Sequence, residues 1–492
     1  MKRRLAWAMT AVFAVALAAG LLGMGVRATY GGHAAVDEPQ YLLTALSLAE
    51  DGDLNIADEL ADRRWRAFFD AELPVQTQPL ADGRQLSPHD PLLPVLLAAP
   101  MGAGGFLAAK AFLALLAGAT AALVLWVAVR RFAVPLGLAT AGVAIAFASP
   151  PFAVYAQQVY PELPAALAVV VSVAALTGRL GRAGLTALTL AVVALPWLSV
   201  KYVPVAAMLA LVGGGVLLRA RRRAAAGVLA GVLAVAGLAY LGVHRAIWGG
   251  WTVYASGDHF VTTGEFSVVG VDPNYVGRGL RLVGLLADRG YGLAAWQPAW
   301  LLALPALAAL LAARPRGWPA IALPLAAGWL MATFIALTMH GFWWPGRQVV
   351  IVLPLALLAV LWWPAHCLHR PAGRRIGRRV APALGLAGVF AYACLLIDGW
   401  AREITWVTGF ERVDNPIYQA IRTALPDYRS GGAGLWIRHI GWIVIFAALA
   451  AAGWRSARGP TGPAPDQQLT PSSSPDLARQ PTGSPHLAKG SP

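Results

Sequence analysis

The chain has 492 residues, of which 58% are hydrophobic and only 13% are charged, and its formal net charge is +15. A mean hydropathy of +0.59, with long apolar runs recurring from end to end, excludes a water-soluble globular domain and predicts an all-α polytopic membrane protein. The positive charge indicates membrane topology and contact with anionic lipid, so we expect membrane lipid and no nucleic acid as a partner.

Apolar runs long enough to cross a bilayer predict about twelve transmembrane helices. Residues 1–26 fit two interpretations, because a basic N-terminus followed by an apolar run is also typical of a cleaved signal peptide. The run is about 22 residues long, which exceeds the usual apolar core of a signal peptide and favours an uncleaved span. The expected spans are about 5–26, 104–129, 135–154, 161–178, 183–200, 202–218, 224–243, 292–312, 318–339, 347–366, 380–398 and 435–453.

Lysine and arginine concentrate in the short turns on one side of these alternating spans. The turns hold about half of the 39 basic residues and none of the 24 acidic residues. Short loops rich in basic residues stay in the cytoplasm, so we expect a multi-pass plasma-membrane protein with both termini cytoplasmic.

Three longer segments then face the exterior, at about 27–103, 244–291 and 399–434. Apolar residues that recur at helical spacing over 41–49, and the Arg, Trp and Phe residues of 63–69, predict two interfacial helices within the first of these segments. The chemistry of the protein is therefore expected outside.

Residues 1–453 form one predicted transmembrane domain. The remaining residues, 454–492, are rich in Pro, Ser, Gly and Gln without periodicity. That composition is typical of a disordered segment, here a cytoplasmic tail.

The most informative fragment is Asp37-Glu38-Pro39-Gln40-Tyr41, shortly after the first span. Asp at the N-cap, Pro in the first turn and Gln at the third position predict a variant capping box that opens the next helix. A cap uses one carboxylate oxygen, so Asp37 could also act as a base on a substrate brought up by a lipid carrier. Glu38 fits either a surface acid that complements the helix dipole or a member of the same catalytic site.

The second candidate is the segment Ser87-Pro88-His89-Asp90-Pro91, just before the chain re-enters the membrane. Prolines fix the backbone here and hold His89 and Asp90 on a stiff loop, which suits a site. The alternative is a helix start, with Asp90 as N-cap and Pro91 as the first helical residue.

Basic residues at the ends of spans form the third candidate. Lys201 joins the fifth and sixth spans with almost no polar loop, and Arg347 follows Pro345-Gly346. Such side chains usually snorkel to headgroups, but they can also line a site. The Pro-Gly break frees backbone donors and favours a site at Arg347. Arg245, at the outer end of the seventh span, is a weaker candidate.

The remaining polar motifs point to little chemistry. Glu162, after Pro161 at the start of the fourth span, can be a plain first-turn acid. No cluster has zinc spacing and no Gly-rich loop suggests a nucleotide site, so we predict no cofactor, with a divalent metal left open. An outward-facing enzyme would then receive its activated donor on a lipid.

At these motifs the chain resembles the GT-C superfamily of integral membrane glycosyltransferases, in particular the branch with protein O-mannosyltransferases and lipid A aminoarabinose transferases. The resemblance covers roughly residues 1–370. It is carried by Asp37-Glu38, the helix and Gly-Asp turn from Tyr41 to Asp53, the segment from Gly83-Arg84 to Pro91-Leu92, Tyr160-Pro161-Glu162, and Trp343 to Arg347. The resemblance implies a polyprenyl-phosphate sugar donor, a cell-envelope glycan, lipid or protein as acceptor on the outer face, and inversion at the anomeric carbon with Asp37 as base.

Two positions depart from the family pattern. Lipid A aminoarabinose transferases have an Arg three residues after the Asp and a Lys before paired prolines, both used on the donor phosphate, whereas this chain has Gln40 and His89. We therefore assign the donor phosphate to Arg347 and Lys201, together with His89. Further candidates for substrate contacts are Tyr41, Asp90, Glu162, Arg84 and Arg245.

The sequence thus predicts a GT-C-like transferase in which Asp37 deprotonates an acceptor hydroxyl while Arg347 and Lys201 neutralise the departing phosphate. The alternative is a transporter or flippase for a lipid-linked or small polar substrate, with proline breaks lining a path and Lys201 as counter-ion. No acid falls in the middle of an expected span, and this favours the transferase.

Overall fold

The structure of the protein, a computed structural model, describes residues 2–74, 76–253, 274–336, 338–368, 373 and 375–458. Within these residues β structure is limited to isolated bridges. Seven of the described helices are long and apolar enough to cross a membrane, and five shorter apolar helices accompany them. Each of these helices matches one of the expected spans in order, so the prediction of an all-α polytopic membrane protein is confirmed. The sidedness of the termini stays a prediction.

The helices fall into three groups by length. The long ones are α1 (Lys2–Gly23), α4 (Leu92–Arg131), α10 (Arg223–Trp248) and α20 (Gly432–Ala457), together with three that are continuous with a short neighbouring helix: α9 (Val203–Arg219; Val200–Arg219 with η2), α15 (Trp318–Leu330; Trp318–Ile335 with η6) and α18 (Ala381–Trp400; Ile376–Trp400 with η8). The shorter apolar ones are α5 (Leu136–Phe147), α7 (Glu162–Leu176), α8 (Arg182–Leu198), α14 (Ala303–Ala313) and α16 (Leu353–His366). Connecting helices are α2 (Glu38–Glu50), α3 (Ala57–Ala61), η1 (Arg64–Ala67), α6 (Phe152–Tyr155), η2 (Val200–Tyr202), α11 (Tyr275–Gly279), α12 (Arg281–Ala287), α13 (Leu293–Trp296), η5 (Pro298–Leu302), η6 (Met331–Ile335), η7 (Arg347–Val349), η8 (Ile376–Val380), η9 (Phe410–Arg412) and α19 (Pro416–Ile421).

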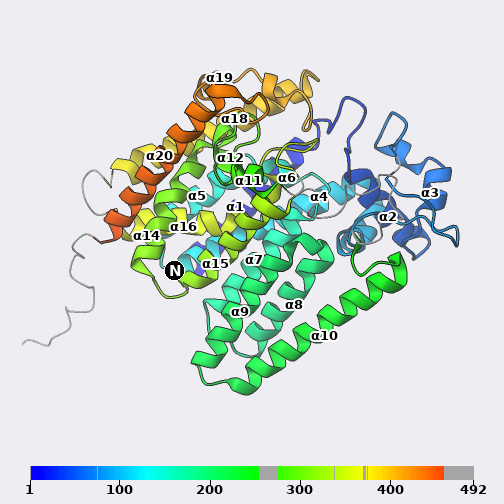
Figure 1. The fold of residues 1–492 in the computed structure, drawn as a ribbon, viewed down its shortest axis with the longest axis horizontal. Coiled ribbons are helices and arrows are strands. Elements are labelled where there is room, and N and C mark those ends of the chain that lie inside the picture. Colours follow the sequence, from blue (N-terminus) through cyan, green and yellow to red (C-terminus); the bar gives the residue numbers. More distant parts are fainter. Residues whose placement is uncertain are drawn as a thin grey trace, which may run out of the picture.

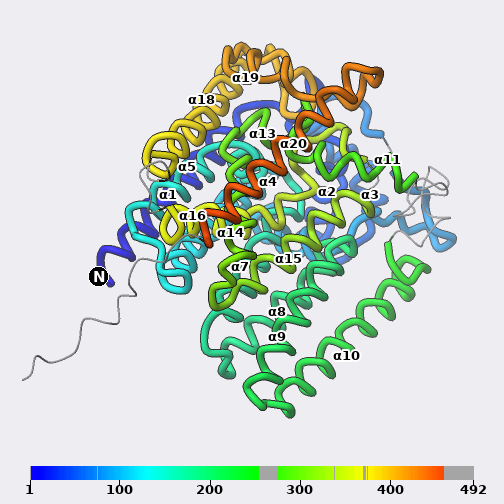
Figure 2. The backbone as a smooth tube through the Cα atoms, turned by 60° about the vertical axis from the view of Figure 1, so that its left-hand side comes forward, coloured from blue at the N-terminus to red at the C-terminus, as the bar shows by residue number. Residues whose placement is uncertain are grey.

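Helix α4 is central to the bundle and packs against α1, α2 and α7 (Figure 1). Helices α7, α8 and α9 lie side by side, α15 packs on α9, and α14 packs on α16 and α20. Helix α10 runs along one edge and contacts α8 and α9, as Figure 2 shows. Few of its residues are buried, and its outer surface is apolar, as expected of a helix that faces lipid.

A kink divides α4 where the second span was expected to begin. Gly104 and Gly105 leave the helical conformation, and Gly105 has a φ of +65°, a region that favours glycine. The predicted span 104–129 therefore corresponds to the part of α4 beyond the kink. The part of α4 before the kink is also helical, and it falls in the segment that was expected as the first exterior loop.

The first loop contains the two expected helices in altered form. The first ten residues of α2 are all buried, and α2 packs against α4, so protein covers the faces that were assigned to the membrane interface. The second is a single 3₁₀ turn, η1, in which Trp65 is buried while Arg64 and Arg66 pair with Glu50 and Glu72. These two arginines are thus paired with acids of the first loop.

The later helices end within a few residues of the predicted ends of their spans. Helix α10 continues to Trp248, and α20 continues to Ala457, a few residues into the expected tail. The predicted disordered tail from 459 onward, and 254–273 of the second exterior segment, lie outside the described residues.

Candidate functional site

Two acidic and two basic side chains from distant parts of the chain meet in one place, which we term the charged cluster. Asp37 precedes α2, Glu162 begins α7, Lys201 lies in η2 and Arg347 begins η7. Arg347 joins both acids, because its Nη2 donates to Asp37 Oδ2 at 2.8 Å and its Nε donates to Glu162 Oε1 at 3.1 Å. Lys201 Nζ donates to the same Glu162 oxygen at 2.9 Å. The structure therefore brings together four of the residues that the sequence singled out.

Each cation of the cluster lies where a membrane helix is interrupted. Helix α8 ends at Leu198, and Ser199 is extended before η2 begins. Before η7, Gly346 has a φ of +86°, and a Cβ added there would come within 2.7 Å of Leu293. These interruptions turn the chain so that Lys201 and Arg347 leave the regular helices, as the Pro-Gly break suggested.

Arg347 is held against two aromatic rings. Its guanidinium carbon lies 3.8 Å from the ring centroid of Tyr160 and 5.3 Å from that of Trp343. Cation–π contacts of this kind are strongest when water is excluded, and the Arg347 side chain is only 8% exposed. Within the described chain Nη1 forms no hydrogen bond. One edge of a firmly held guanidinium is thus available to a ligand.

His89 approaches the charged cluster from the first loop. Its ring stacks on Tyr41 with centroids 4.4 Å apart, and Nε2 lies 3.8 Å from Asp37 Oδ1. Nε2 is buried and has no hydrogen-bond partner in the described chain. Burial lowers the pKa of His89 against the opposing charge of Asp37, and the charge of Arg347 lowers it further, so the ring is neutral at pH 7. A neutral imidazole can form a hydrogen bond with a substrate group but adds no charge.

Asp37 is ionised and partly accessible. Burial by itself would raise the pKa of Asp37, but the neighbouring groups Arg347, His89 and Lys201 together outweigh burial and lower it, with Arg347 the strongest of them. The side chain keeps 19% of its surface exposed, and Oδ1 forms no hydrogen bond within the described chain. One carboxylate oxygen is therefore free to accept a proton.

Neither Asp37 nor Asp90 caps a helix with its side chain. Asp37 occupies the N-cap position of α2, but its side chain forms no cap bond because it pairs with Arg347. Helix α4 begins at Leu92 after Pro91, without a side-chain cap. The local sequence patterns located the helix starts. The carboxylates of Asp37 and Asp90, however, bind groups that are distant in the sequence.

Glu38 belongs to a second, buried network and not to the charged cluster. It accepts hydrogen bonds from the backbone N–H of Ala35 at 3.3 Å and of Val159 at 2.9 Å. Lys110 Nζ lies 4.0 Å from its carboxylate. Burial raises the pKa of Glu38 against the effect of Lys110. Sequence reasoning missed Lys110, although a lone cation in the middle of an apolar run was a usable signal.

Asp90 fixes the first loop to two other parts of the chain. Its Oδ2 accepts the backbone N–H of Val200 at 2.9 Å, and its Oδ1 accepts the Tyr240 hydroxyl at 2.7 Å. His244 Nε2 lies 3.1 Å from the same Oδ1. Because Val200 directly precedes Lys201, Asp90 positions the segment that carries this lysine.

Two further predicted site residues, Arg84 and Arg245, also lie outside the charged cluster. Arg84 is exposed and pairs with Asp82 at 2.8 Å. Arg245 is exposed, donates to the Gly249 carbonyl and lies over the Trp251 ring. Neither has a contact with the cluster, so the structure gives no support to their assignment as substrate-binding residues.

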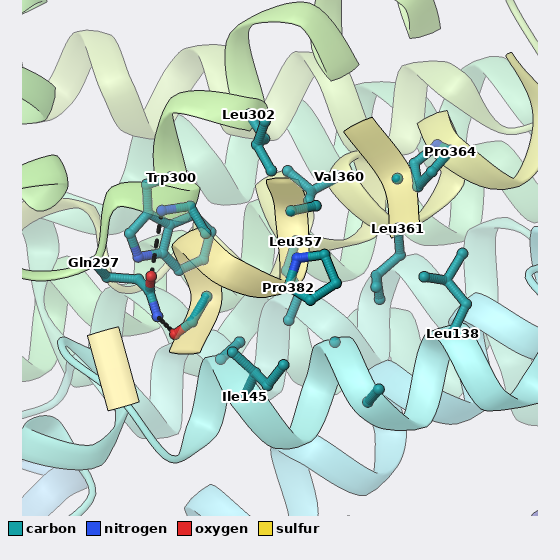
Figure 3. Close-up of a pocket in the computed structure, with 17 residues that line it drawn as sticks. Leu138, Ile145, Gln297, Trp300, Leu302, Leu357, Val360, Leu361, Pro364 and Pro382 are labelled. Atoms are coloured by element: carbon teal, nitrogen blue, oxygen red, sulfur yellow. Dashed lines mark hydrogen bonds between the residues drawn. The ribbon is translucent and has the colours of Figure 1, made fainter. Parts of the chain in front are cut away.

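An apolar pocket of about 140 Å³ lies among α5, η5, α16 and α18, away from the charged cluster. Figure 3 shows aliphatic side chains and prolines along most of its wall, with Gln297 and Trp300 at one end. Gln297 Nε2 donates to Ser149 Oγ at 2.7 Å and to the Gly385 carbonyl at 3.1 Å, which satisfies the amide. The pocket suits a hydrocarbon chain, and no residue of the charged cluster lines it.

No protein-family model matches the chain, and no curated protein matches its sequence. Among solved structures, the chain is similar to ArnT from Cupriavidus metallidurans, whose crystal structure contains undecaprenyl phosphate. The two share 14% sequence identity with a TM-score of 0.47, over 91% of this chain and 77% of the ArnT chain. The function therefore has to be inferred from the side chains of the site.

Proposed function

We propose that the protein transfers a sugar from a polyprenyl-phosphate-linked donor to an acceptor at the outer face of the membrane, with inversion at the anomeric carbon. One observation carries the proposal. An accessible, ionised carboxylate, Asp37, shares a site with two cations, Arg347 and Lys201, at interruptions of membrane helices. Base and phosphate-binding groups side by side are what such a transfer requires.

In the proposed reaction the free oxygen of Asp37 accepts the proton of an acceptor hydroxyl. The acceptor oxygen attacks the sugar C1, the bond from C1 to the phosphate oxygen breaks, and the polyprenyl phosphate leaves with the bonding electrons. A base in this position is worth about 10²–10⁴-fold in rate. Asp37 is suited to the role because it is ionised at neutral pH.

Arg347 and Lys201 would bind the phosphate that leaves. Arg347 keeps Nη1 available, and Lys201 uses one of its three N–H donors, on Glu162. Charge develops on the phosphate as the bond breaks, so donors that are already oriented stabilise the transition state more than the ground state. Glu162 would orient both cations.

His89 would complete the phosphate site as a neutral hydrogen-bonding group. Its buried Nε2 has no partner in the described chain and lies on the Asp37 side of the cluster. A buried polar atom without a partner is costly unless a ligand satisfies it. The ring therefore fits a donor that brings a hydrogen-bonding oxygen.

The test uses a deletion strain that carries either the wild-type protein or Asp37→Asn. We expect a lipid-linked sugar to accumulate in the deletion strain and in the Asp37→Asn strain, and to disappear with the wild type, measured by mass spectrometry of lipid extracts. Identical lipid profiles in all three strains would contradict the proposal.

A second measurement separates transfer from transport. Purified protein in proteoliposomes is supplied with the accumulated lipid and with membranes as acceptor. Transfer releases free polyprenyl phosphate, whereas a flippase leaves the sugar–phosphate bond intact and changes only the leaflet. Intact donor on the opposite leaflet would favour the transporter alternative.

A further inference from the structure

Three carboxylates gather at the far end of α2 from Asp37. Asp51 directly follows α2, and Asp58 and Glu59 lie in α3. One ligand oxygen from each lies within 4.8 Å of the others. Helix α2 has 13 residues, so this group lies roughly 20 Å along the helix from Asp37. In Figure 1 α2 and α3 lie together at one side of the molecule.

Glu59 is the unusual member of this group. The residue is only 2% exposed, and both of its carboxylate oxygens are buried without a hydrogen-bond partner in the described chain. A buried carboxylate without any partner is strongly unfavourable, so such groups are normally paired, protonated or bound to a metal.

No cation of the described chain compensates this charge. Asp51, Asp58 and Glu59 form no salt bridge there, and the nearby Arg64 is bound through two nitrogens to Glu50 at 2.7 and 2.8 Å. Asp51 also lies at the C-terminus of α2, where the helix dipole disfavours an anion. The three acids, one of them with both oxygens buried and unpaired in the described chain, and the C-terminus of α2 together favour a positively charged ligand.

We propose that one calcium ion binds to Asp51, Asp58 and Glu59 and thereby links the C-terminal end of α2 to α3. Hard cations take carboxylate oxygens, and calcium accepts them at about 2.3–2.6 Å in flexible geometry. Oxygens within 4.8 Å of one another can reach such an ion directly. Magnesium requires shorter bonds of about 2.0–2.1 Å in a regular octahedron and keeps much of its water. Backbone carbonyls or water would complete the calcium shell. The inference stands apart from the proposed transfer reaction.

The experiment measures calcium binding to the full-length protein in nanodiscs after removal of metals with EDTA. We expect titration calorimetry with calcium chloride to show one site, with a Kd near the 10⁻⁴–10⁻³ M that is typical of extracellular modules. We also expect Tm to rise by a few degrees with millimolar calcium. Magnesium at the same concentration is expected to give a smaller rise.

Two variants assign the site. Asp58→Asn changes an exposed ligand, and Glu59→Gln keeps the shape of the buried one. Each is expected to weaken calcium binding at least about tenfold and to remove most of the rise in Tm. Glu72→Gln, an exposed acid of the same loop that pairs with Arg66, is the matched control and should bind calcium like the wild type.

The metal-free state adds a distinguishing readout. With EDTA, Glu59→Gln should have a Tm equal to or above that of the wild type because it removes repulsion among the acids, and with calcium the order should reverse. If the wild type shows neither calorimetric binding nor a rise in Tm, or if both variants respond to calcium like the wild type, the proposal is overturned.

Discussion

Arg347 Nη2 lies 2.8 Å from Asp37 Oδ2, although 310 positions of the chain separate the two residues. The contact joins the first loop to the start of η7 and ties the proposed base to the proposed phosphate ligand. A donor phosphate that bound the free Nη1 edge of Arg347 would share the guanidinium with Asp37. The second anion beside Asp37 would make its carboxylate a stronger base, which couples the two halves of the proposed site.

The first prediction concerns Asp37→Asn. The substitution removes the base but keeps an oxygen that can accept a hydrogen bond from Arg347. Transfer of sugar from a lipid-linked donor should fall by about 10²-fold or more. The measurement is release of polyprenyl phosphate by purified protein, with membrane abundance determined in parallel.

Asp82→Asn is the matched control, since Asp82 is an exposed acid of the same loop paired with Arg84. It should keep wild-type activity. If Asp37→Asn retained activity within a few fold of the wild type at normal abundance, Asp37 would have only a structural role.

The second prediction concerns the cations. Arg347→Lys keeps the charge but loses the planar fork, whereas Arg347→Gln loses both, so affinity for the lipid-linked donor should fall in that order. Arg347→Gln also leaves Asp37 without its ion-pair partner in a site where Arg347 is 8% exposed, while Glu162 keeps Lys201, and the loss is expected to cost about 3–5 kcal/mol of stability. Affinity is therefore measured on the folded fraction recovered by size exclusion.

Lys201→Gln separates binding from folding more cleanly, because Lys201 is 16% exposed and, among the acids that the structure describes, forms a salt bridge with Glu162 alone. We expect weaker donor binding with a smaller loss of Tm than for Arg347→Gln. Wild-type binding by both glutamine variants would mean that the phosphate is held elsewhere.

The helical framework could be predicted from sequence because the evidence for it is local. Each apolar run is long enough to span a bilayer, and its hydropathy does not depend on its neighbours. The kink at Gly104 and the extension of α20 to Ala457 moved boundaries without changing the order of the helices. The local capping patterns failed for Asp37 and Asp90 because distant side chains and backbone groups bind their carboxylates.

The charged cluster was predictable in composition but not in pairing. Isolated charges at helix interruptions singled out Lys201 and Arg347 as candidates, and the acidic pair singled out Asp37. Nothing in the sequence indicated that Glu162 would bridge the two cations, or that Glu38 would turn to Lys110 in another network. Those choices depend on how α4 and α7 pack, which a single sequence does not display.

The third prediction tests Asp90 as a positioning residue. Asp90→Ala removes the acceptor for Val200, Tyr240 and His244, and each hydrogen bond to a charged group is worth about 1.5–3 kcal/mol. We expect a clear loss of Tm together with a fall in kcat, because Val200 adjoins Lys201. Tyr240→Phe removes one of these bonds and should lower Tm less, with little change in kcat. A normal kcat for Asp90→Ala would contradict the positioning role.

The fourth prediction is the pH dependence of the reaction. Because Arg347 lowers the pKa of Asp37 below its ordinary value of 3.8, the base stays ionised through the physiological range. The group binds its proton less readily in the folded than in the unfolded state, so the stability it contributes is present above the unfolded pKa and is lost as pH falls through the folded one. Activity should therefore show no acid limb from Asp37 in the physiological pH range.

In Arg347→Gln burial acts on Asp37 without the opposing charge of the guanidinium, and the acid limb of the residual activity should move to higher pH. An unchanged profile in that variant would mean that another group limits the rate at low pH.

The fifth prediction concerns sidedness, on which every functional assignment above depends. Basic residues fill the turns on one side of the helices and acids avoid them, so reporter fusions after residue 130 and in the tail should read cytoplasmic. Fusions near 75, 265 and 420 should read exterior. The fusion near 75 is decisive, because it reports on the loop that carries Asp37 and His89. A cytoplasmic signal there would put the charged cluster on the side of the membrane where nucleotide-activated donors are available. The need for a lipid-linked donor would then disappear, even if the ion pairs of the cluster were as described.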